Sequence, residues 1–262
     1  MTTYADPVNS LDLAGRTALV TGAAGGIGAA CSLRIAAAGA TVRAVDRDAE
    51  GLAQLAGRAD RLPGSVEAVV LDLADLDAAE EAATGADILV NNAGIQLVRP
   101  IEDFPPDAFH NILTVMLEAP FRLIRGALPH MYEQGWGRIV NISSVHGLRA
   151  SAYKSAYVAA KHGLEGLSKT AALEGAPHGV TSNCVSPGYV RTPLVEKQLA
   201  DQASAHSLPA EQVLTEVLLA RQALKRLVEP EEVAEAVAYL CAPHASFITG
   251  TTLTMDGGWT AH

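Results

Sequence analysis

Short apolar runs alternate along this chain with longer amphipathic segments. Several runs are apolar at consecutive positions, which is typical of strands covered on both faces in a parallel sheet. The intervening segments are long enough for crossover helices. Strands are expected at residues 17–21, 41–45, 66–72, 86–94, 137–143, 180–188 and 251–258. The pattern therefore predicts an α/β fold, a doubly wound parallel sheet of seven strands with helices on both faces.

Residues 189–228 interrupt this alternation, because no strand is expected there. Pro193 and Pro209 bracket a polar stretch, and the helical run VLTEVLLARQAL follows at 213–224. Insertions of this length often cover a ligand site, so a helical substrate lid is predicted at about 189–228. Neither a shift in composition nor a Gly/Ser linker divides the chain, and residues 1–262 are interpreted as one domain.

A glycine-rich turn, TGAAGGIG at 21–28, follows the first expected strand and opens a helical segment. Glycines let the backbone approach a pyrophosphate, whose charge is met by free N–H groups and the positive end of the helix dipole. A glycine turn alone is a weak signal, but Asp46 ends the next strand eighteen residues after Gly28, as in dinucleotide-binding sites. A carboxylate there accepts hydrogen bonds from ribose hydroxyls and repels a 2′-phosphate. The cofactor is therefore predicted to be NAD, although Arg43 or Arg47 could pair with a phosphate if Asp46 pointed away.

The segment SAYKSAYVAAKHG at 151–163 places Tyr157 and Lys161 four residues apart, on one side of a helix. A phenol with a pKa of about 10 is a poor base near neutrality, but a neighbouring ammonium favours the phenolate. Lys161 is therefore expected to lower the pKa of Tyr157 and make it a usable acid and base. Ser144, at the end of the fifth expected strand, is placed to hydrogen-bond a substrate oxygen as carbonyl and alcohol interconvert.

These motifs, with NNAG at 91–94, resemble the Rossmann-type short-chain dehydrogenase/reductase family over essentially the whole chain. The resemblance implies hydride transfer, with Ser144, Tyr157 and Lys161 as catalytic residues, and a homotetramer. It assigns the pyrophosphate to the glycine turn, the adenine to the segment at 72–73 and the carboxamide to the segment at 187–192. The implied NAD-binding residues are Thr21, Gly22, Gly26, Ile27, Gly28, Asp46, Asp72, Leu73, Asn92, Ala93, Gly94, Tyr157, Lys161, Pro187, Gly188, Val190 and Thr192.

Met116 departs from the family pattern, because aligning VMLEAPF at 115–121 puts it where a catalytic asparagine is usual. In the family, the backbone carbonyl at that position is thought to bind a water that carries protons between the lysine and solvent. Pro120 has no N–H, so a helical Met116 carbonyl has lost its i+4 donor. We expect the relay to persist through the Met116 carbonyl.

Within the family, the match narrows to the 3-hydroxybutyrate dehydrogenases. The motifs that carry it are GIQ (94–96), SSVHGL (143–148), YKSAYVAAKHG (153–163), GYVRTPLVEKQ (188–198) and DGGWTAH (256–262). This resemblance implies oxidation of (R)-3-hydroxybutyrate to acetoacetate. It assigns the methyl end of the substrate to Trp259. It assigns the carboxylate to Gln96, His146, Lys154 and Gln198.

Two other functions stay open at this point. One is a reductase of 3-oxoacyl thioesters or sugars, in which His146 and Lys154 merely lie at the surface. The other is a nucleotide-binding regulatory protein that has lost catalysis, and Met116 alone favours it.

Composition narrows the partners and the compartment. Acidic residues outnumber basic ones 29 to 19, and the net charge of −10 disfavours nucleic acid or an anionic membrane as a partner. Cys31, Cys184 and Cys241 are widely spaced without a metal-ligand pattern, so buried thiols and no metal are predicted. Neither a secretory leader nor a run of 18 apolar residues is recognisable. We therefore expect a cytoplasmic protein that acts on a small molecule.

Overall fold

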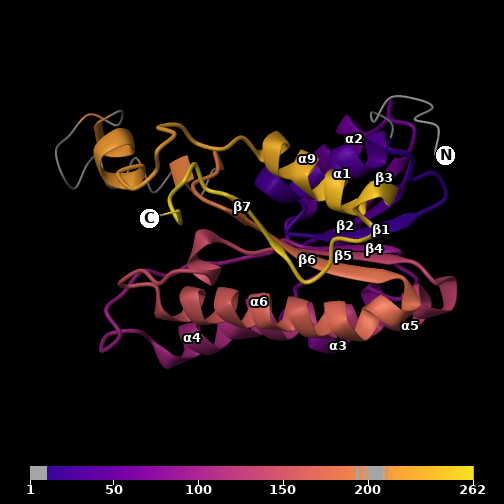
Figure 1. Cartoon of the computed structure of the whole chain (residues 1–262), viewed down its shortest axis with the longest axis horizontal. Coiled ribbons are helices and arrows are strands. Elements are labelled where there is room, and N and C mark those ends of the chain that lie inside the picture. Colours follow the sequence, from indigo (N-terminus) through magenta and orange to yellow (C-terminus); the bar gives the residue numbers. More distant parts are fainter. Residues whose placement is uncertain (1–10, 193–194, 197–198, 200–208, 210–211, 262) are drawn as a thin grey trace.

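Seven parallel strands form one sheet at the centre of the structure (Figure 1). The computed structural model describes residues 11–192, 195–196, 199, 209 and 212–261. The strand order is β3-β2-β1-β4-β5-β6-β7. The strands are β1 (Thr17–Thr21), β2 (Thr41–Asp46), β3 (Ser65–Val70), β4 (Ile88–Asn91), β5 (Gly137–Ile142), β6 (Val180–Pro187) and β7 (Thr252–Met255). The predicted doubly wound sheet is confirmed.

The burial of each strand follows its position in the sheet. β4, β5 and β6 are buried at every residue, whereas the edge strands β3 and β7 are partly exposed. Leu19 and Val20 of β1 are both fully buried, but they belong to the hydrophobic cores on opposite faces. Successive side chains of a strand point to opposite faces, so consecutive apolar residues are needed wherever helices cover both sides.

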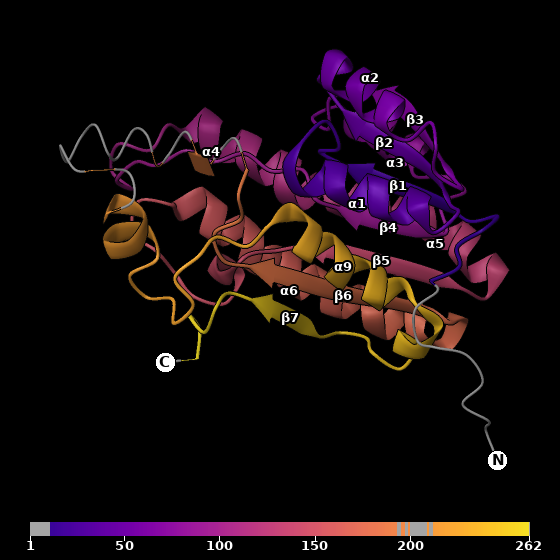
Figure 2. The same ribbon diagram turned by 90° about the horizontal axis from the view of Figure 1, so that it is seen from above.

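Helices cover both faces of the sheet. In Figure 1, α1, α2 and α9 lie over one face and α3, α4, α5 and α6 over the other, and in Figure 2 α1 and α9 run side by side. The helices are α1 (Gly26–Ala37), α2 (Ala49–Arg58), α3 (Leu76–Ala82), α4 (Pro106–Leu113), α5 (Ala119–Gln134), α6 (Ser155–Gly175) and α9 (Pro230–Cys241). Short 3₁₀ turns occupy Val145–Gly147, Ala176–His178 and Pro243–Ala245, and π-helical turns occupy Thr114–Glu118 and Val213–Leu218. In the described part of the chain, none of the helices combines the length and apolar character that crossing a bilayer requires.

The chain reverses its direction of progress through the sheet between β1 and β4. From β1 it proceeds through β2 to the edge strand β3, and it then returns to β4 and proceeds to the opposite edge. Ligands of open parallel sheets bind outside the carboxyl ends of the strands at such a switch point. The fold therefore brings four distant segments together there, the ones that follow β1, β4, β5 and β6.

The expected strand at 86–94 is shorter in the structure, because β4 ends at Asn91. The next two backbone N–H groups, of Asn92 and Ala93, donate to Thr21 Oγ1 at 3.0 and 3.1 Å. The side chain of Thr21 thus takes over from the backbone ladder. This arrangement turns residues 92–94 out of the sheet, toward the switch point.

The expected lid at about 189–228 is described only in part. A parallel bridge joins Val190 to Val228, and Leu218, Leu219 and Leu227 form a small buried cluster against which Tyr189 packs. The π-helical turn Val213–Leu218 begins where the apolar helical run was expected. Residues 193–194, 197–198, 200–208 and 210–211 lie outside the described residues, and Gln198 is among them.

Candidate active site

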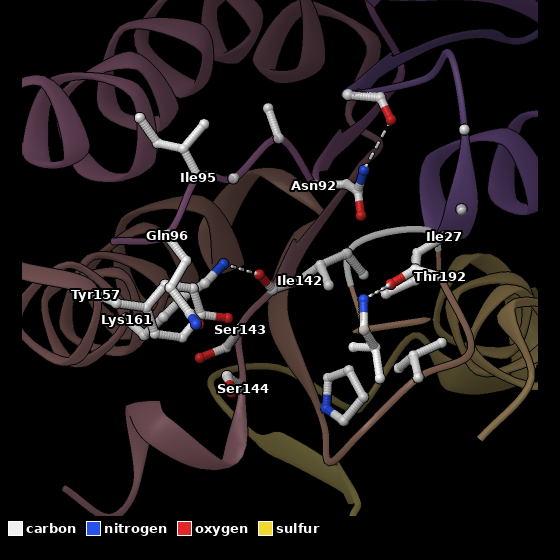
Figure 3. Close-up of a pocket in the computed structure, with 18 of the residues that line it drawn as sticks. Ile27, Asn92, Ile95, Gln96, Ile142, Ser143, Ser144, Tyr157, Lys161 and Thr192 are labelled. Carbon is white, nitrogen blue, oxygen red and sulfur yellow. Dashed lines mark hydrogen bonds between the residues drawn. The ribbon is translucent and has the colours of Figure 1, made fainter. Parts of the chain in front are cut away.

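Two adjoining cavities lie at the switch point. The first, of about 390 Å³, is lined by the glycine turn, Asp46 and the segments that follow β4, β5 and β6 (Figure 3). The second, of about 500 Å³, is lined by the 3₁₀ turn after β5, the start of α6, the segment at 218–222 and Trp259. Five residues line both cavities, namely Gln96, Ser144, Tyr157, Gly188 and Val195. The predicted catalytic serine and tyrosine are therefore on the shared wall.

The glycine turn forms a cradle of backbone at the start of α1. Gly25 precedes the helix without a side-chain cap, so the first N–H groups of α1 are not used by a capping side chain. A Cβ at Gly28 would lie 2.1 Å from the Gly22 carbonyl oxygen, and one at Gly22 would lie 2.8 Å from Ala93 Cα. A Cβ at Gly25, in contrast, would meet no atom within 4 Å. The turn is closely packed behind and open in front, which suits a pyrophosphate.

Thr21 and Gly28 support this cradle from behind and do not line the first cavity. The Asn92 side chain donates to the carbonyl oxygens of Thr21 and Gly22 at 2.9 and 3.1 Å. Together with the Thr21 hydroxyl, these bonds tie the ends of β1 and β4 to each other. Of the predicted cofactor residues, those that line the cavity are Gly22, Gly26, Ile27, Asp46, Asn92, Ala93, Gly94, Tyr157, Lys161, Pro187, Gly188, Val190 and Thr192.

The end of β2 carries an acid whose direction is fixed. The Asp46 carboxylate accepts the backbone N–H groups of Ala24 and Asp48, both at 3.1 Å. It also lines a third, neighbouring cavity of about 260 Å³, together with the predicted adenine-flanking residues Asp72 and Leu73.

The two arginines near Asp46 have different surroundings. The Arg43 guanidinium donates to the carbonyl oxygens of Ala82 and Thr84 at 2.8 and 3.0 Å, at the end of α3. Arg47 is exposed and lines the third cavity. Arg43 is thus bonded elsewhere, and Arg47 is the one of the two that lines the cavity beside the predicted adenine-flanking residues.

Tyr157 and Lys161 of α6 lie together beside β5. Lys161 Nζ donates to the Ile142 carbonyl oxygen at 2.6 Å and lies 5.7 Å from the centroid of the Tyr157 ring. Figure 3 shows both residues with Gln96 on one side of the cavity, and Ile27 and Thr192 on the other. Burial lowers the pKa of Lys161 to about 8.

The pKa of Tyr157 differs from the expectation. Burial raises the pKa of the Tyr157 phenol, and a hydrogen bond with Ser144 opposes that increase only in part. The Lys161 ammonium donates to a carbonyl and not to the phenol, so it does not overcome the burial. Burial therefore favours the protonated phenol, and positive charge brought close to it would favour the phenolate.

Glu165 is a buried charge that the sequence did not single out. It lies one helical turn after Lys161 and is 4% exposed. Its carboxylate accepts the hydroxyls of Ser186 at 2.9 Å and Thr252 at 2.5 Å. The Glu165 charge raises the pKa of Lys161, against the effect of burial. The i+4 spacing from Lys161 is the signal that could have identified it.

Met116 is buried within the π-helical turn Thr114–Glu118. Its sulfur accepts the Ile95 N–H at 3.4 Å, so the thioether holds the loop that leads to Gln96. The turn widens at the residues before Pro120, where the missing N–H disrupts the normal α-helical ladder. A water on the Met116 carbonyl stays a prediction.

The predicted carboxylate-binding residues meet in the second cavity. Lys154 Nζ lies 3.4 Å from His146 Nε2, and the two residues are 8% and 9% exposed. Burial and the Lys154 charge lower the pKa of His146 to about 4. Burial also lowers the pKa of Lys154. Near neutrality the imidazole is thus uncharged, so its Nε2 can accept a hydrogen bond from the Lys154 ammonium and adds no second positive charge.

An aromatic row continues from the Tyr157 phenol along this wall. The His146 ring stands edge-on to Tyr157, with centroids 6.1 Å apart, and edge-on to Trp259 at 5.8 Å. The guanidinium carbon of Arg221 lies 5.6 Å from the centroid of the Trp259 ring. His146, Lys154 and Trp259 are therefore brought together beside Tyr157, as predicted, and Gln96 faces them from the shared wall.

Several residues of the second cavity were missed by the sequence. Besides the predicted ones, it is lined by Val145, Ala150, Ser151, Ala152, Tyr189, Val195, Leu218, Ala220, Arg221 and Gln222. Those at 218–222 belong to a run that shows only helical periodicity. No local motif marks them, because tertiary packing alone turns them toward the cavity.

Comparison with known proteins agrees with this geometry. A family model described as enoyl-(acyl carrier protein) reductase matches residues 22–260. The chain belongs to the short-chain dehydrogenase/reductase family. It is 48% identical over 261 residues to a D-beta-hydroxybutyrate dehydrogenase of Rhizobium meliloti, covering 94% of this chain and 99% of the relative. It is 43% identical over 257 residues to one of Cupriavidus necator, covering 95% and 99%.

A solved structure of the same family shows the fold with a cofactor. It is that of a candidate 2-deoxy-D-gluconate 3-dehydrogenase from Agrobacterium tumefaciens with bound NADP, at a TM-score of 0.85 and 34% identity. The match covers 97% of this chain and 100% of that one. The short-chain dehydrogenase/reductase fold binds a nicotinamide cofactor, and this chain is an oxidoreductase of that family.

Proposed function

We propose that this protein is an NAD-dependent 3-hydroxybutyrate dehydrogenase, which interconverts (R)-3-hydroxybutyrate and acetoacetate. The observation that carries the proposal is the Lys154–His146 pair, buried 3.4 Å apart on the wall that adjoins Tyr157. A generic ketone reductase has no need of a buried ammonium there, whereas a small carboxylate would repay its desolvation. The relatives named D-beta-hydroxybutyrate dehydrogenase support the same substrate.

The side chains on the shared wall can perform the proton transfer. When bound, NAD supplies the nicotinamide carbon that accepts the hydride from C3 of the acid. The Tyr157 phenolate takes the proton of the C3 hydroxyl, and Ser144 donates a hydrogen bond to the same oxygen. Lys161, whose pKa Glu165 raises against the effect of burial, favours that phenolate when charged, together with the positive charge of the oxidised cofactor.

NAD is proposed over NADP because of the fixed carboxylate of Asp46. Its two backbone donors hold it at the wall of the first cavity, where a 2′-phosphate would meet its charge. The ratio of kcat/KM with NAD to that with NADP tests this choice. Asp46→Ala should move the ratio toward NADP, because Arg47 then faces the phosphate without a competing carboxylate. A wild-type preference for NADP would contradict the proposal.

The substrate is tested with (R)-3-hydroxybutyrate, its S enantiomer and its methyl ester. Only the R acid should reduce NAD rapidly. The ester has lost the charge that Lys154 binds, and the S acid, with its carboxylate held there, would not present its C3 hydroxyl and hydrogen in the same way. Lys154→Met should raise KM for the acid by about 10- to 100-fold, the value of a hydrogen bond to a charged group, and leave KM for the ester nearly constant. Equal turnover of acid and ester in the wild type would reject the substrate assignment.

We also propose that the protein is a homotetramer, as the family resemblance implies. Composition and sequence pattern favour single-domain subunits, a cytoplasmic location and no metal. Exposed apolar side chains support association, among them Leu173 at 79% and Phe247 at 100% exposure. Light scattering coupled to size-exclusion chromatography measures the assembly directly. A monomeric mass at micromolar concentration would reject this part of the proposal.

A further inference from the structure

Gln222 has a well-defined place on the wall of the second cavity. The next two backbone N–H groups, of Ala223 and Leu224, both donate to the Gly257 carbonyl oxygen, at 2.8 and 3.1 Å. These bonds fix the segment against the C-terminal turn that carries Trp259. Gln222 is therefore held beside the end of the cavity assigned to the substrate methyl group.

The side chain of Gln222 is a buried amide whose oxygen has no hydrogen-bond partner among the described residues. The residue is 3% exposed. A Cβ added at Gly188 would lie 3.6 Å from Oε1, and one added at Gly257 would lie 3.0 Å from Nε2. Two glycines thus leave room for this amide. An unpaired polar atom destabilises a fold, so a buried one beside a cavity calls for a partner, either a water or a polar group of a molecule that enters the cavity.

This amide serves a different part of the substrate from the carboxylate. Lys154 and His146 come from the start of α6 and the 3₁₀ turn after β5, whereas Gln222 comes from the segment beside Trp259. Gly188, against which the amide oxygen lies, belongs to both cavities. The amide oxygen therefore lies beside a glycine that the two cavities share. With the reacting carbon C3 at that shared wall, the next carbon, C4, would face this amide.

We propose that Gln222 hydrogen-bonds a hydroxyl group carried by that carbon, and that the enzyme accepts hydroxy acids with a second hydroxyl at C4. This inference rests on the proposed function, because it presumes that the carboxylate is bound by Lys154. A hydroxyl both donates and accepts a hydrogen bond, so it pairs with the amide whichever of its two polar atoms faces the cavity. A methyl group at the same place leaves the amide unpaired.

Two acids of nearly equal size isolate this contact. In 3,4-dihydroxybutanoate the C4 carbon carries a hydroxyl, and in 3-hydroxypentanoate it carries a methyl group. Both acids need the same spatial arrangement at C3, which carries opposite R/S labels in the two because the C4 hydroxyl changes the priority order. Wild-type kcat/KM should then favour the dihydroxy acid by about tenfold, the value of one neutral hydrogen bond. Gln222→Met keeps the length of the side chain and removes both polar atoms, so the preference should disappear or reverse.

Two further variants separate the possible causes. Gln222→Glu keeps an acceptor and adds a negative charge, so both acids should bind more weakly while the dihydroxy acid keeps its advantage. Gln96→Leu alters the predicted carboxylate contact and should weaken both acids alike. Thermal unfolding of each variant shows that the protein is folded.

The outcomes are distinct for the two proposals. Suppose that wild type oxidises 3-hydroxybutyrate, but the ratio of kcat/KM for 3,4-dihydroxybutanoate to that for 3-hydroxypentanoate is the same in wild type and Gln222→Met. The amide is then satisfied by a trapped water, and the inference is overturned. If wild type oxidises none of the acids with either cofactor, the proposed function fails and takes the inference with it. A ratio that collapses only in Gln222→Met supports both.

Discussion

The cofactor cavity and the substrate cavity are built from different chemistry. Around the first, the decisive features are backbone: an uncapped helix start, and glycines packed against a carbonyl and a neighbouring loop. Around the second, they are side chains, with an ammonium, an imidazole and an indole grouped beside the Tyr157 phenol. The first site depends on glycines, whose lack of a Cβ leaves the backbone accessible. The second depends on polar and charged side chains that are buried.

The two designs fail in opposite ways. Adding one methyl group behind the glycine turn collides with backbone, which cannot move aside. Removing one polar atom from the substrate wall leaves its partner buried and unpaired. Substitutions that add a methyl group at the glycine turn and substitutions that remove a polar atom from the substrate wall therefore test this contrast.

The largest effect is expected at the wall that the two cavities share. Tyr157→Phe removes the group that exchanges the substrate proton, so kcat should fall by about 10²- to 10⁴-fold, the usual value of general acid–base catalysis. Steady-state kinetics with (R)-3-hydroxybutyrate and NAD measures it. Tyr153→Phe is the matched control, because it deletes the same hydroxyl from a side chain that is 58% exposed. A similar loss in both variants would show that the assigned phenol is not special.

The next effect concerns the dependence of stability on pH. The pKa of His146 is about 4 in the folded protein, against an ordinary value of 6.5. The unfolded chain thus binds more protons between these values, and the free energy of unfolding should rise with pH across that window. The contribution is roughly 3 kcal/mol.

Urea unfolding at several pH values isolates this term. His146→Gln cannot titrate, so its stability should rise less steeply between pH 4 and 6.5 than that of wild type. His244→Gln is the substitution control, because it makes the same replacement at an exposed histidine that lines neither cavity. Parallel curves for wild type and His146→Gln would mean that the imidazole is not held uncharged.

A smaller effect is expected on the cofactor side. Gly28→Ala places a Cβ 2.1 Å from the Gly22 carbonyl oxygen. The free energy of unfolding should fall by about 1–3 kcal/mol, as in other overpacked sites. Gly25→Ala is its partner experiment, because the added Cβ meets nothing within 4 Å. It should spare the stability and weaken NAD binding, as measured by calorimetry. Loss of stability in both would remove the distinction between the packed and the open side of the turn.

The same contrast explains what the sequence could predict. The strands, the glycine turn and Asp46 were all expected, because each follows from neighbouring residues and a fixed spacing. The Lys154–His146 pair was expected only through family resemblance. Glu165 and Gln222 were missed, since the residues around them lie far along the chain. Glu165 accepts hydroxyls from β6 and β7, and Gln222 packs beside the glycines at 188 and 257. The direction of the Tyr157 pKa was wrong because burial, which no local pattern reveals, exceeds the effect of its neighbours.

The smallest effect is expected from relieving backbone strain at Tyr153, beside the substrate cavity. Tyr153 has a φ of +66°, the only positive value outside glycine among the described residues, and it directly precedes Lys154. Its carbonyl accepts the Arg99 N–H at 2.9 Å, which holds the turn in place. A Cβ in this region costs about 1 kcal/mol, and the greater freedom of an unfolded glycine offsets part of the gain. Tyr153→Gly should therefore raise the free energy of unfolding by less than about 1 kcal/mol and leave KM unchanged, whereas Tyr153→Ala, which keeps the Cβ, should bring no gain. If Tyr153→Ala stabilised the protein as much as Tyr153→Gly, the gain would come from removing the exposed ring. The positive φ of Tyr153 would then not be a source of strain beside Lys154.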